Sequence, residues 1–470
     1  MSRPSVCWFR RDLRLADNPA LAAAAADGPV VPLFVLDPVF LTRAGAPRLA
    51  FLLACLRSLD ASMGGALVVR HGDPAAVVPT FAADLGAVRV VAADDGGVYG
   101  QRRDALVAAR LRADGRHLTL TGSPYAVPPG RVRKGDGTPY AVFTPFRRTW
   151  EATGWDAPQP APSVDWLGAP AVSCDGIPAL AAVEALPETV RAALPAPGEA
   201  AAHDRLDVFL VEALAGYREQ RDLPAVDGTS RLSAHLRFGT VHPRQVLAHL
   251  GDGPGASTFR SELAWREFYA DVWRNRPRSG WHNLQQRMDA MVLDTDAAAR
   301  RRFAAWAAGR TGYPFVDAGM RQLLATGWMH NRVRMVVASF LVKDLHLPWQ
   351  WGAAHFLRHL VDGDLASNNH GWQWAAGTGT DAAPYFRVFN PVSQGQKFDP
   401  AGAYVRHWVP ELAVVADRYV HAPWTAPQGL PLGAEGPMVD HATERDEALA
   451  RYAATGARSG AVRRVGVGSR

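Results

Sequence analysis

Residues 362–390 read DGDLASNNHGWQWAAGTGTDAAPYFRVFN, and the rest of the chain is best interpreted outward from this stretch. It has few apolar residues for a core helix, but it holds two tryptophans, two early carboxylates and paired asparagines. In a helix that begins near Asp364, residues Asp364, Asn368 and Trp372 are four apart and share one face. Such a stripe suits a buried, polar, planar ligand, although each residue alone would fit a capped helix with a polar face.

Length and composition predict a folded protein with two domains. The 470 residues can bury large cores, and the combination of 48% hydrophobic with 20% charged residues is typical of globular chains. The sequence contains no run of about 18 uncharged apolar residues and no signal peptide, so we expect no membrane span and a cytoplasmic location. Three cysteines without a CxxC motif predict neither disulfides nor a metal site. The net charge of +6 permits nucleic-acid binding without demonstrating it.

The chain changes character along its length. Apolar runs at residues 30–36, 66–70 and 87–92 alternate with alanine-rich helical stretches, which predicts a doubly wound, Rossmann-like parallel sheet that lacks a GxGxxG phosphate loop. Later residues read as helices. Eleven of the fifteen tryptophans lie beyond residue 260. We predict an α/β domain over 1–125, a Pro-, Ala- and Gly-rich connector over 126–200, a helical domain over 201–457 and a disordered tail over 458–470.

Three further clusters in the helical part could carry chemistry. Residues 228–233 read GTSRLS and offer hydroxyls and backbone amides at a helix start, which fits a phosphate cradle or an ordinary N-cap. Residues 262–269 read ELAWREFY and put Glu262, Trp265 and Arg266 on one helix face, which also fits a surface ion pair beside a core tryptophan. In residues 326–335, Asn331 and Met335 share one helix face.

These stretches together closely resemble the DNA photolyase/cryptochrome family, most nearly the class I cyclobutane pyrimidine dimer (CPD) photolyases. The resemblance extends from residues 6–15, which read VCWFRRDLRL, to about residue 452. It implies an N-terminal antenna domain and a C-terminal helical domain that binds FAD and DNA. The FAD-binding positions that it implies are Tyr217, Thr229, Ser230, Arg231, Leu232, Ser233, Arg334, Asp362, Asp364 and Asn368.

The resemblance also implies roles in catalysis. Glu262 would hydrogen-bond the damaged bases, Asn368 would face the flavin N5, and Arg334 would pair with Asp362 beside the isoalloxazine. That pair could equally be a structural salt bridge. The implied catalytic set is Glu262, Asn368, Trp372, Trp349 and Arg334. The implied DNA contacts, with Trp265 and Trp374 as walls of the dimer pocket, are Arg221, Glu262, Trp265, Arg266, Asn331, Arg332, Met335, Trp374 and Gln394.

One feature departs from the family. Most class I members reduce their flavin through three tryptophans, of which the first two correspond to Trp372 and Trp349. The third should lie within residues 291–296, which contain no tryptophan, so that Leu293 or Asp296 takes its place. We predict weak photoreduction or a reroute through Trp281, Trp306 or Trp351, with repair itself retained.

A second chromophore is expected in the N-terminal domain. Residues 94–104 read DDGGVYGQRRD and resemble the antenna-contacting loop of the family, with Asp37 at the end of a strand. Folate-binding members usually carry Asn-Glu in place of Gly100-Gln101. The pattern favours 8-hydroxy-5-deazaflavin over methenyltetrahydrofolate or an empty site.

The predicted function is light-dependent repair of CPDs by electron transfer from excited, reduced FAD to a flipped-out dimer. The expected partner is UV-damaged DNA, single- or double-stranded and recognised by lesion rather than sequence, and the expected state is a monomer. Three alternatives remain open: a cryptochrome-like blue-light photosensor, a (6-4) photolyase, and a flavin-dependent electron transferase unconnected with DNA.

Overall fold

Five parallel strands form a sheet in the computed structural model, which describes residues 3–168, 172–380 and 386–465. The strand order is β3-β2-β1-β4-β5. In chain order the strands are β1 (Ser5–Phe9), β2 (Val30–Leu36), β3 (Val68–His71), β4 (Arg89–Ala92) and β5 (His117–Leu120). The strands β1 and β2 are buried along their whole length, as a parallel sheet covered on both faces requires.

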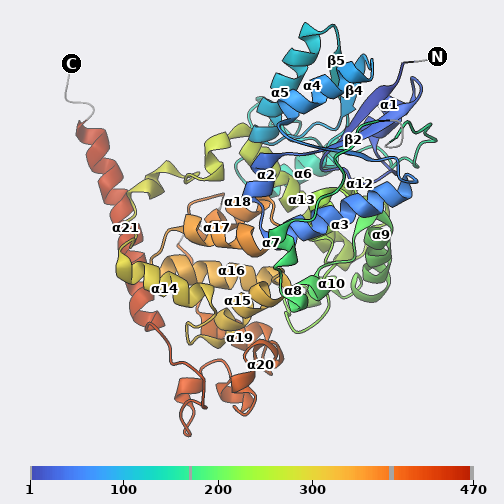
Figure 1. The fold of residues 1–470 in the computed structure, drawn as a ribbon. Helices are drawn as coiled ribbons and strands as arrows, with labels where there is room; N and C mark the ends of the chain where they lie inside the picture. The colour runs from blue at the N-terminus through green and yellow to red at the C-terminus, as the bar shows by residue number, and fades with distance from the viewer. Residues whose placement is uncertain (1–2, 169–171, 381–385, 466–470) are drawn as a thin grey trace. The chain divides into compact units, whose positions relative to one another are not determined.

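Helices cover both faces of this sheet (Figure 1). On β1, Cys7 and Phe9 point to one face and Val6 and Trp8 to the other, because side chains alternate along a strand. The first pair packs with residues of α1 (Pro19–Ala25) and α3 (Ala46–Ser62), and the second with residues of α4 (Pro74–Asp84) and α5 (Val98–Ala113). The predicted doubly wound α/β fold is confirmed.

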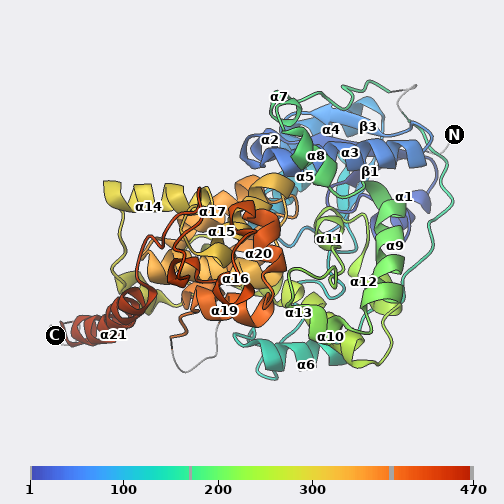
Figure 2. The same cartoon turned by 90° about the horizontal axis from the view of Figure 1, so that it is seen from below.

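The chain divides into two compact units, and the predicted domain boundaries stay a prediction. Unit 1 comprises Met1–Arg218, Thr229–Pro277 and Val361–Asp364, and unit 2 comprises Glu219–Gly228, Arg278–Leu360 and Leu365–Arg470. Beyond the sheet, unit 1 holds helices that we had assigned to the helical domain. They are α9 (Gly198–Val208), which lies beside α3 (Figure 2), α11 (Ser233–Phe238), α12 (Pro243–Ala248) and α13 (Pro254–Asn275).

The predicted connector is part of the core of unit 1. It contains α6 (Phe143–Thr153), whose Phe146 ring lies 5.0 Å from that of Phe268 on α13. The buried carboxylate of Glu267, also on α13, accepts hydrogen bonds from Trp150 Nε1 (2.6 Å) and from the backbone N–H groups of Ala126 and Val127. These contacts tie α13 to the connector, and a Pro-, Ala- and Gly-rich sequence gave no periodic signal of them.

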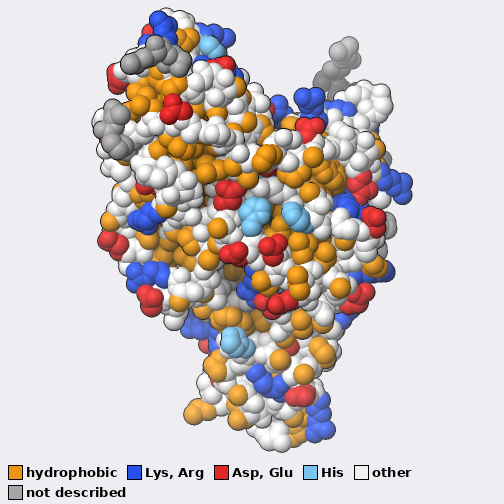
Figure 3. All heavy atoms as spheres, turned by 90° about the vertical axis from the view of Figure 1, so that its right-hand side faces the viewer, with side chains coloured by type: hydrophobic (Ala, Val, Ile, Leu, Met, Phe, Trp, Pro, Cys, Tyr) orange, Lys and Arg blue, Asp and Glu red, His pale blue; other side chains and the backbone are white. Residues whose placement is uncertain are grey.

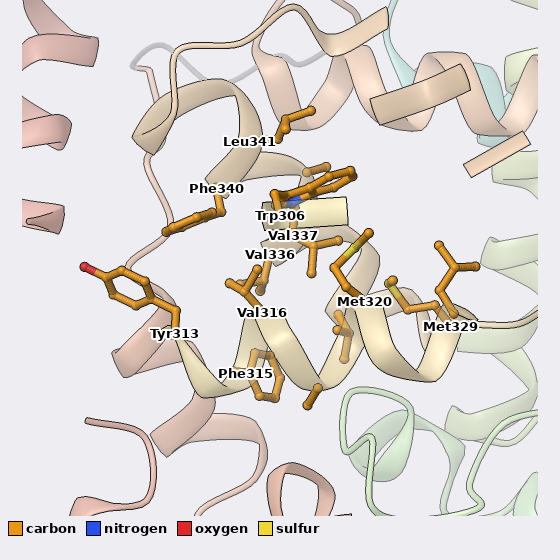
Figure 4. Packing of buried hydrophobic residues seen from close by; sticks show 14 of the residues in the cluster. Trp306, Tyr313, Phe315, Val316, Met320, Met329, Val336, Val337, Phe340 and Leu341 are labelled. Atoms are coloured by element: carbon orange, nitrogen blue, oxygen red, sulfur yellow. The ribbon is translucent and has the colours of Figure 1, made fainter. Parts of the chain in front are cut away.

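Unit 2 is helical and is organised around one large core. Its main helices are α14 (Ala297–Ala307), α15 (Pro314–Thr326), α16 (Asn331–Ser339), α17 (Trp349–His359), α18 (Leu365–Ala376), α19 (Pro391–Phe398) and α20 (Ala403–Trp408). Figure 4 shows Trp306 of α14 packed over Val336 and Val337 of α16, with Met320 of α15 beside them. Trp306 is fully buried, so α14 is anchored to the unit by this ring.

The last helix, α21, extends over His441–Val465. The predicted boundary at residue 458 falls inside this helix, and the disordered tail over 458–470 stays a prediction. Residues 466–470 lie outside the described residues. Among the helices of the described chain, none combines the length and apolar character that a membrane span needs.

Candidate functional site

The helix α18 begins at Leu365, as predicted from the sequence, and much of its polar surface is used to hold the protein together. Gln373 donates to Ser279 O (2.6 Å) and accepts from Leu284 N (2.8 Å), and His370 hydrogen-bonds Ser279 Oγ (2.9 Å). Asn369 donates to a further backbone oxygen of the same segment. These buried polar residues therefore dock α18 against residues 279–284 and are not available to a ligand.

Asn368 and Trp372, on the predicted ligand stripe, are arranged differently. Both amide hydrogens of Asn368 are engaged, because Nδ2 donates to Ala353 O (3.1 Å) and to Asn369 Oδ1 (2.8 Å). The remaining polar atom of the side chain, Oδ1, can accept a hydrogen bond from a ligand N–H. Trp372 is 3% exposed and its Nε1 has no hydrogen-bond partner among the described residues, so this N–H can donate to a bound group.

In unit 1, Asp364 lies in a cluster of arginines that the sequence did not reveal. Its carboxylate is 2.8 Å from Arg11 Nη2 and 3.6 Å from Arg237 Nε. Arg237 Nε and Arg48 Nη1 both donate to Gly363 O, at 3.2 Å and 3.0 Å. The short segment that contains Asp362 and Asp364 is therefore fixed by three cationic side chains from distant parts of unit 1.

Burial and neighbouring charges shift the pKa values of these arginines. Burial, reinforced by the nearby charge of Arg11, lowers the pKa of Arg237 to about 9. Burial also opposes the charge of Arg11, but Tyr125, Asp364 and Asp95 outweigh it and raise the pKa of Arg11. Arg11 and Arg237 remain cationic at neutral pH, and the carboxylates of Asp364 and Asp95 already balance much of this charge.

The predicted phosphate-binding residues precede α11, which begins at Ser233 as expected. Arg205 donates to the carbonyl oxygens of Thr229 (2.8 Å) and Ser230 (2.9 Å), and Leu232 N donates to Ser230 Oγ (3.3 Å). Arg231 has a left-handed backbone with a φ of 52°, which is uncommon outside glycine. Tyr217 is buried against the rings of Phe209 and Phe259.

The predicted residues on α13 divide between exposed and structural positions. Trp265 stacks on Phe143, with ring centroids 3.7 Å apart and planes 9° from parallel, and it stays partly exposed, which leaves ring area for a planar ligand. Arg266 is tied down, since it donates to Pro124 O (3.0 Å) and Leu236 O (2.9 Å) and lies over the ring of Tyr125. Glu262 is partly exposed on the same helix.

The predicted residues on α16 lie in unit 2. Asn331 is exposed at the start of the helix and Met335, partly exposed, follows one turn later. Arg332 forms a two-pronged ion pair with Asp222, at 2.8 Å and 3.2 Å, so much of its charge is already balanced. Arg334 donates to Met329 O (2.8 Å).

Trp374 borders a pocket of unit 2 that opens to solvent. The pocket is lined mainly by cationic and aromatic side chains. They are Arg287, Lys343, Trp374, Phe386, Arg387, Phe389 and Tyr452, and Gln285, Ala375 and Gly377 complete the lining. Arg387 lies over the Trp374 ring, and Lys343 over that of Phe386. Gln394 lies on α19, and Arg221 beside Asp222 at 3.8 Å.

A second cluster lies at the carboxyl ends of β1, β2 and β4. The Trp8 ring is buried between Arg10 and Arg103, which both pair with Asp104, and Tyr99 OH donates to Asp37. A side chain at Gly100 would meet Asp95, whose Oδ2 would lie 2.6 Å from the added Cβ. Ligands of open α/β sheets bind at this edge, where the strand order reverses around β1.

The predicted site residues are thus divided between the units. Tyr217, Thr229 to Ser233, Glu262, Trp265, Arg266, Asp362 and Asp364 belong to unit 1, whereas the remaining predicted residues belong to unit 2. The pairing of Arg334 with Asp362, and the placing of Trp265 opposite Trp374, therefore stay predictions. The arginine cluster around Asp364 is the part of the site that sequence reasoning missed.

Comparison with known proteins identifies the family. Residues 5–163 match the family model described as DNA photolyase, and residues 259–454 match that described as the FAD binding domain of DNA photolyase. A deoxyribodipyrimidine photo-lyase of Streptomyces griseus is 44% identical over 464 residues, which cover 95% of this chain and 98% of that protein. The chain belongs to the DNA photolyase/cryptochrome family.

Solved structures agree with this assignment. A class III photolyase from Agrobacterium tumefaciens superposes with a TM-score of 0.89 at 39% identity, covering 97% of this chain and 98% of that one. A cryptochrome from Synechocystis sp. PCC6803 gives 0.87 at 28% identity, with 95% and 98% coverage. The fold is therefore that of photolyases and cryptochromes, and the predicted subdivision, class I, is not established by these neighbours.

The described residues fit FAD. The buried Trp372 Nε1 without a partner and the free acceptor of Asn368 supply polar contacts of the kind that a planar, amide-rich ring system needs. In unit 1, the arginines around Asp364 fix the segment that holds the predicted FAD-binding residues Asp362 and Asp364.

Proposed function

We propose that this chain catalyses light-dependent repair of CPDs in DNA. The observation that carries the proposal is the match, along nearly the full length of both chains, to a protein named deoxyribodipyrimidine photo-lyase, together with the predicted lesion contacts Glu262 and Trp265 on one face of α13. The family's FAD-binding domain supports FAD as the cofactor.

When bound and reduced, FAD supplies on excitation the electron that splits the cyclobutane ring and then returns. The residues of the chain position the reactants and tune the charge around them. Asn368 offers an amide acceptor that does not titrate, so it cannot protonate a ligand nitrogen. Trp265 offers a rigid aromatic surface, backed by Phe143, on which an extruded base can stack.

The direct test is repair of UV-irradiated oligothymidylate by the chemically reduced, FAD-loaded protein under blue light. We expect recovery of the thymine absorbance, with none in the dark. If the protein binds and reduces FAD but restores no thymine, the photosensor becomes the better assignment. Restoration of (6-4) photoproducts alone would favour the (6-4) photolyase.

The class I assignment within the family and the antenna are further parts of the proposal. Support for 8-hydroxy-5-deazaflavin comes from Gly100, because the Asn that folate-binding members carry at that position would collide with Asp95. Purification from a host that makes both chromophores, followed by mass spectrometry of the released cofactors, tests this. Bound methenyltetrahydrofolate, or FAD alone, would contradict the deazaflavin assignment.

The DNA partner is proposed to be read by lesion rather than by sequence. Phosphate contacts carry no sequence information, and stacking on Trp265 or Trp374 accepts any planar base. Binding of irradiated and unirradiated oligonucleotides of scrambled sequence tests this, and light scattering during the same titration tests the expected monomer. A preference for sequence over damage would contradict it.

A further inference from the structure

Four aromatic side chains of unit 2 form a continuous series across three helices. The ring of Trp372 on α18 contacts that of Trp306 on α14, with centroids 6.0 Å apart. Trp306 stacks with Phe303, one turn earlier on α14, at 5.6 Å and 28°, and Phe303 meets Trp351 on α17 edge to face at 5.6 Å. No gap between neighbouring centroids in this series exceeds 6.0 Å.

The environment of the indoles changes along the series. Trp372 is 3% exposed and Trp306 is fully buried, whereas Trp351 is only partly buried. Trp306 Nε1 donates to Val337 O (3.1 Å), so its proton is held inside the protein core. The series therefore starts at the indole that we assign to the FAD site and ends at one that meets solvent.

The tryptophan path expected from the family, through Trp372 and Trp349, does not end at a solvent-exposed tryptophan in the expected segment. Trp349 is 2% exposed and its Nε1 donates to Asn283 Oδ1 (2.9 Å). Of the two positions predicted to replace the surface tryptophan, Leu293 or Asp296, Asp296 is the N-cap of α14 and accepts from Ala299 N (2.7 Å). If Trp349 were oxidised, the radical would therefore lie on a buried ring. The expected segment would offer no third tryptophan to reduce it.

We infer that Trp306 and Trp351, with Phe303 between them, form the relay that feeds electrons to Trp372 and so to FAD. The inference rests on the proposed function. With FAD bound and excited by light, Trp372 would give it one electron, Trp306 would then give one electron to Trp372, and Trp351 one electron to Trp306. Trp351 releases its indole proton to water, and an external thiol returns one electron and one proton to it. Phe303, which is harder to oxidise, only bridges the two indoles.

The indoles of Trp306 and Trp351 have different ionisable groups beside them. His355 contacts the Trp306 ring at 5.6 Å, and burial, with the charges of His359 and Arg358, lowers its pKa to about 3. It is therefore neutral at physiological pH and does not repel a positive charge on Trp306. Arg300 lies over Trp351 at 5.2 Å, so this cation disfavours a positive charge on the ring and makes loss of the indole proton necessary for a stable oxidised Trp351. Loss of that proton leaves a neutral radical on Trp351, at the surface.

The test is the rate of FAD photoreduction by blue light with an added thiol, in the FAD-loaded full-length protein. We expect Trp306→Phe and Trp351→Phe to slow it at least about tenfold, or about 1.4 kcal/mol on the barrier. The transient absorption of a deprotonated tryptophan radical should disappear in Trp351→Phe. Phe303→Leu, which keeps every tryptophan, should slow the reaction as well. Trp408→Phe, a partly buried tryptophan on α20, is the matched control.

The rival paths give distinct results. Slowing by Trp349→Phe or Trp281→Phe, with none by Trp306→Phe and Trp351→Phe, would overturn the relay. FAD content and thermal unfolding of each variant show whether it has folded. Repair by dithionite-reduced protein separates the two proposals, because relay variants should repair normally once reduced. If no variant repairs, the proposed function fails while the radical signal still tests the relay.

Discussion

A single amide shows how strongly the site constrains residue identity. Asn368 donates two hydrogen bonds, to Ala353 O and Asn369 Oδ1, so an aspartate in its place would face two oxygen atoms with no hydrogens to offer. We expect Asn368→Asp to lower the free energy of unfolding by about 2 kcal/mol and to reduce FAD retention. Urea unfolding and flavin absorbance per chain measure both. Asn331→Asp, on the exposed start of α16, is the control, and equal stability of the two variants would contradict the argument.

A buried histidine of unit 1 makes stability depend on pH. Burial lowers the pKa of His235 from 6.5 to about 4, and its Nδ1 hydrogen-bonds Thr240 Oγ1 (2.8 Å). Between these two values the unfolded chain binds more protons than the folded one, so stability is full above about pH 6.5 and is lost as the pH falls toward about 4.

His235→Gln, which keeps a polar partner for Thr240 but does not titrate, should flatten this dependence. Urea unfolding at about pH 7 and about pH 5 measures it, and we expect the loss between them to shrink by roughly 1 to 2 kcal/mol in the variant. His117→Gln, an exposed residue of β5, should leave the loss as in the parent protein. A loss as large in His235→Gln as in the parent would show that His235 is not its source.

Residue identity alone could not reveal the arginines around Asp364. Asp364 itself was predicted, because it begins the polar stripe of residues 362–390. Arg11 and Arg237 lie 353 and 127 positions away in sequence, and nothing in their local pattern separates them from solvated arginines. Their role follows from which backbone segments the fold brings together, and that information is not local.

On the scale of elements, α18 shows what a helical period can and cannot decide. The period placed Asp364, Asn368 and Trp372 on one stripe, and the helix does begin at Leu365. It could not show that the neighbouring Asn369 and Gln373 bind protein instead of ligand, because both faces are equally polar. Burial of polar groups on a helix is decided by what the opposite segment offers, here the backbone of residues 279–284.

The docking of α18 can be tested through Gln373. It is fully buried and makes one hydrogen bond as a donor and one as an acceptor, so its removal breaks one hydrogen bond to Ser279 O and one from Leu284 N. We expect Gln373→Ala to cost about 3 kcal/mol in the free energy of unfolding. Gln286→Ala, at an exposed position, should change it by less than about 0.5 kcal/mol. Denaturant unfolding compares them, and similar costs would show that α18 is held mainly by its apolar side.

For the whole molecule, net charge is a weak guide to where DNA binds. The chain carries a charge of +6, yet acidic and basic side chains are interspersed on the face in Figure 3. Several arginines that the sequence offered as DNA contacts are already engaged, Arg266 with backbone carbonyls and Arg332 with Asp222. Cations that border an open space with aromatic neighbours are better candidates than cations counted from composition.

The pocket beside Trp374 supplies such a cation in Arg287, which is exposed, donates to Tyr452 OH (3.0 Å) and has no carboxylate among the residues that line the pocket with it. If Arg287 meets a DNA phosphate, Arg287→Ala should weaken binding of damaged and undamaged DNA by the same factor and reduce the slope of log K against log salt by about 0.9. Arg445→Ala, an exposed arginine of α21 that lies 3.5 Å from Asp446, is the control and should change neither. Fluorescence titrations at several salt concentrations give both quantities. A loss confined to damaged DNA with an unchanged slope would place Arg287 at the lesion instead, and no loss at all would remove this pocket from the DNA-binding surface.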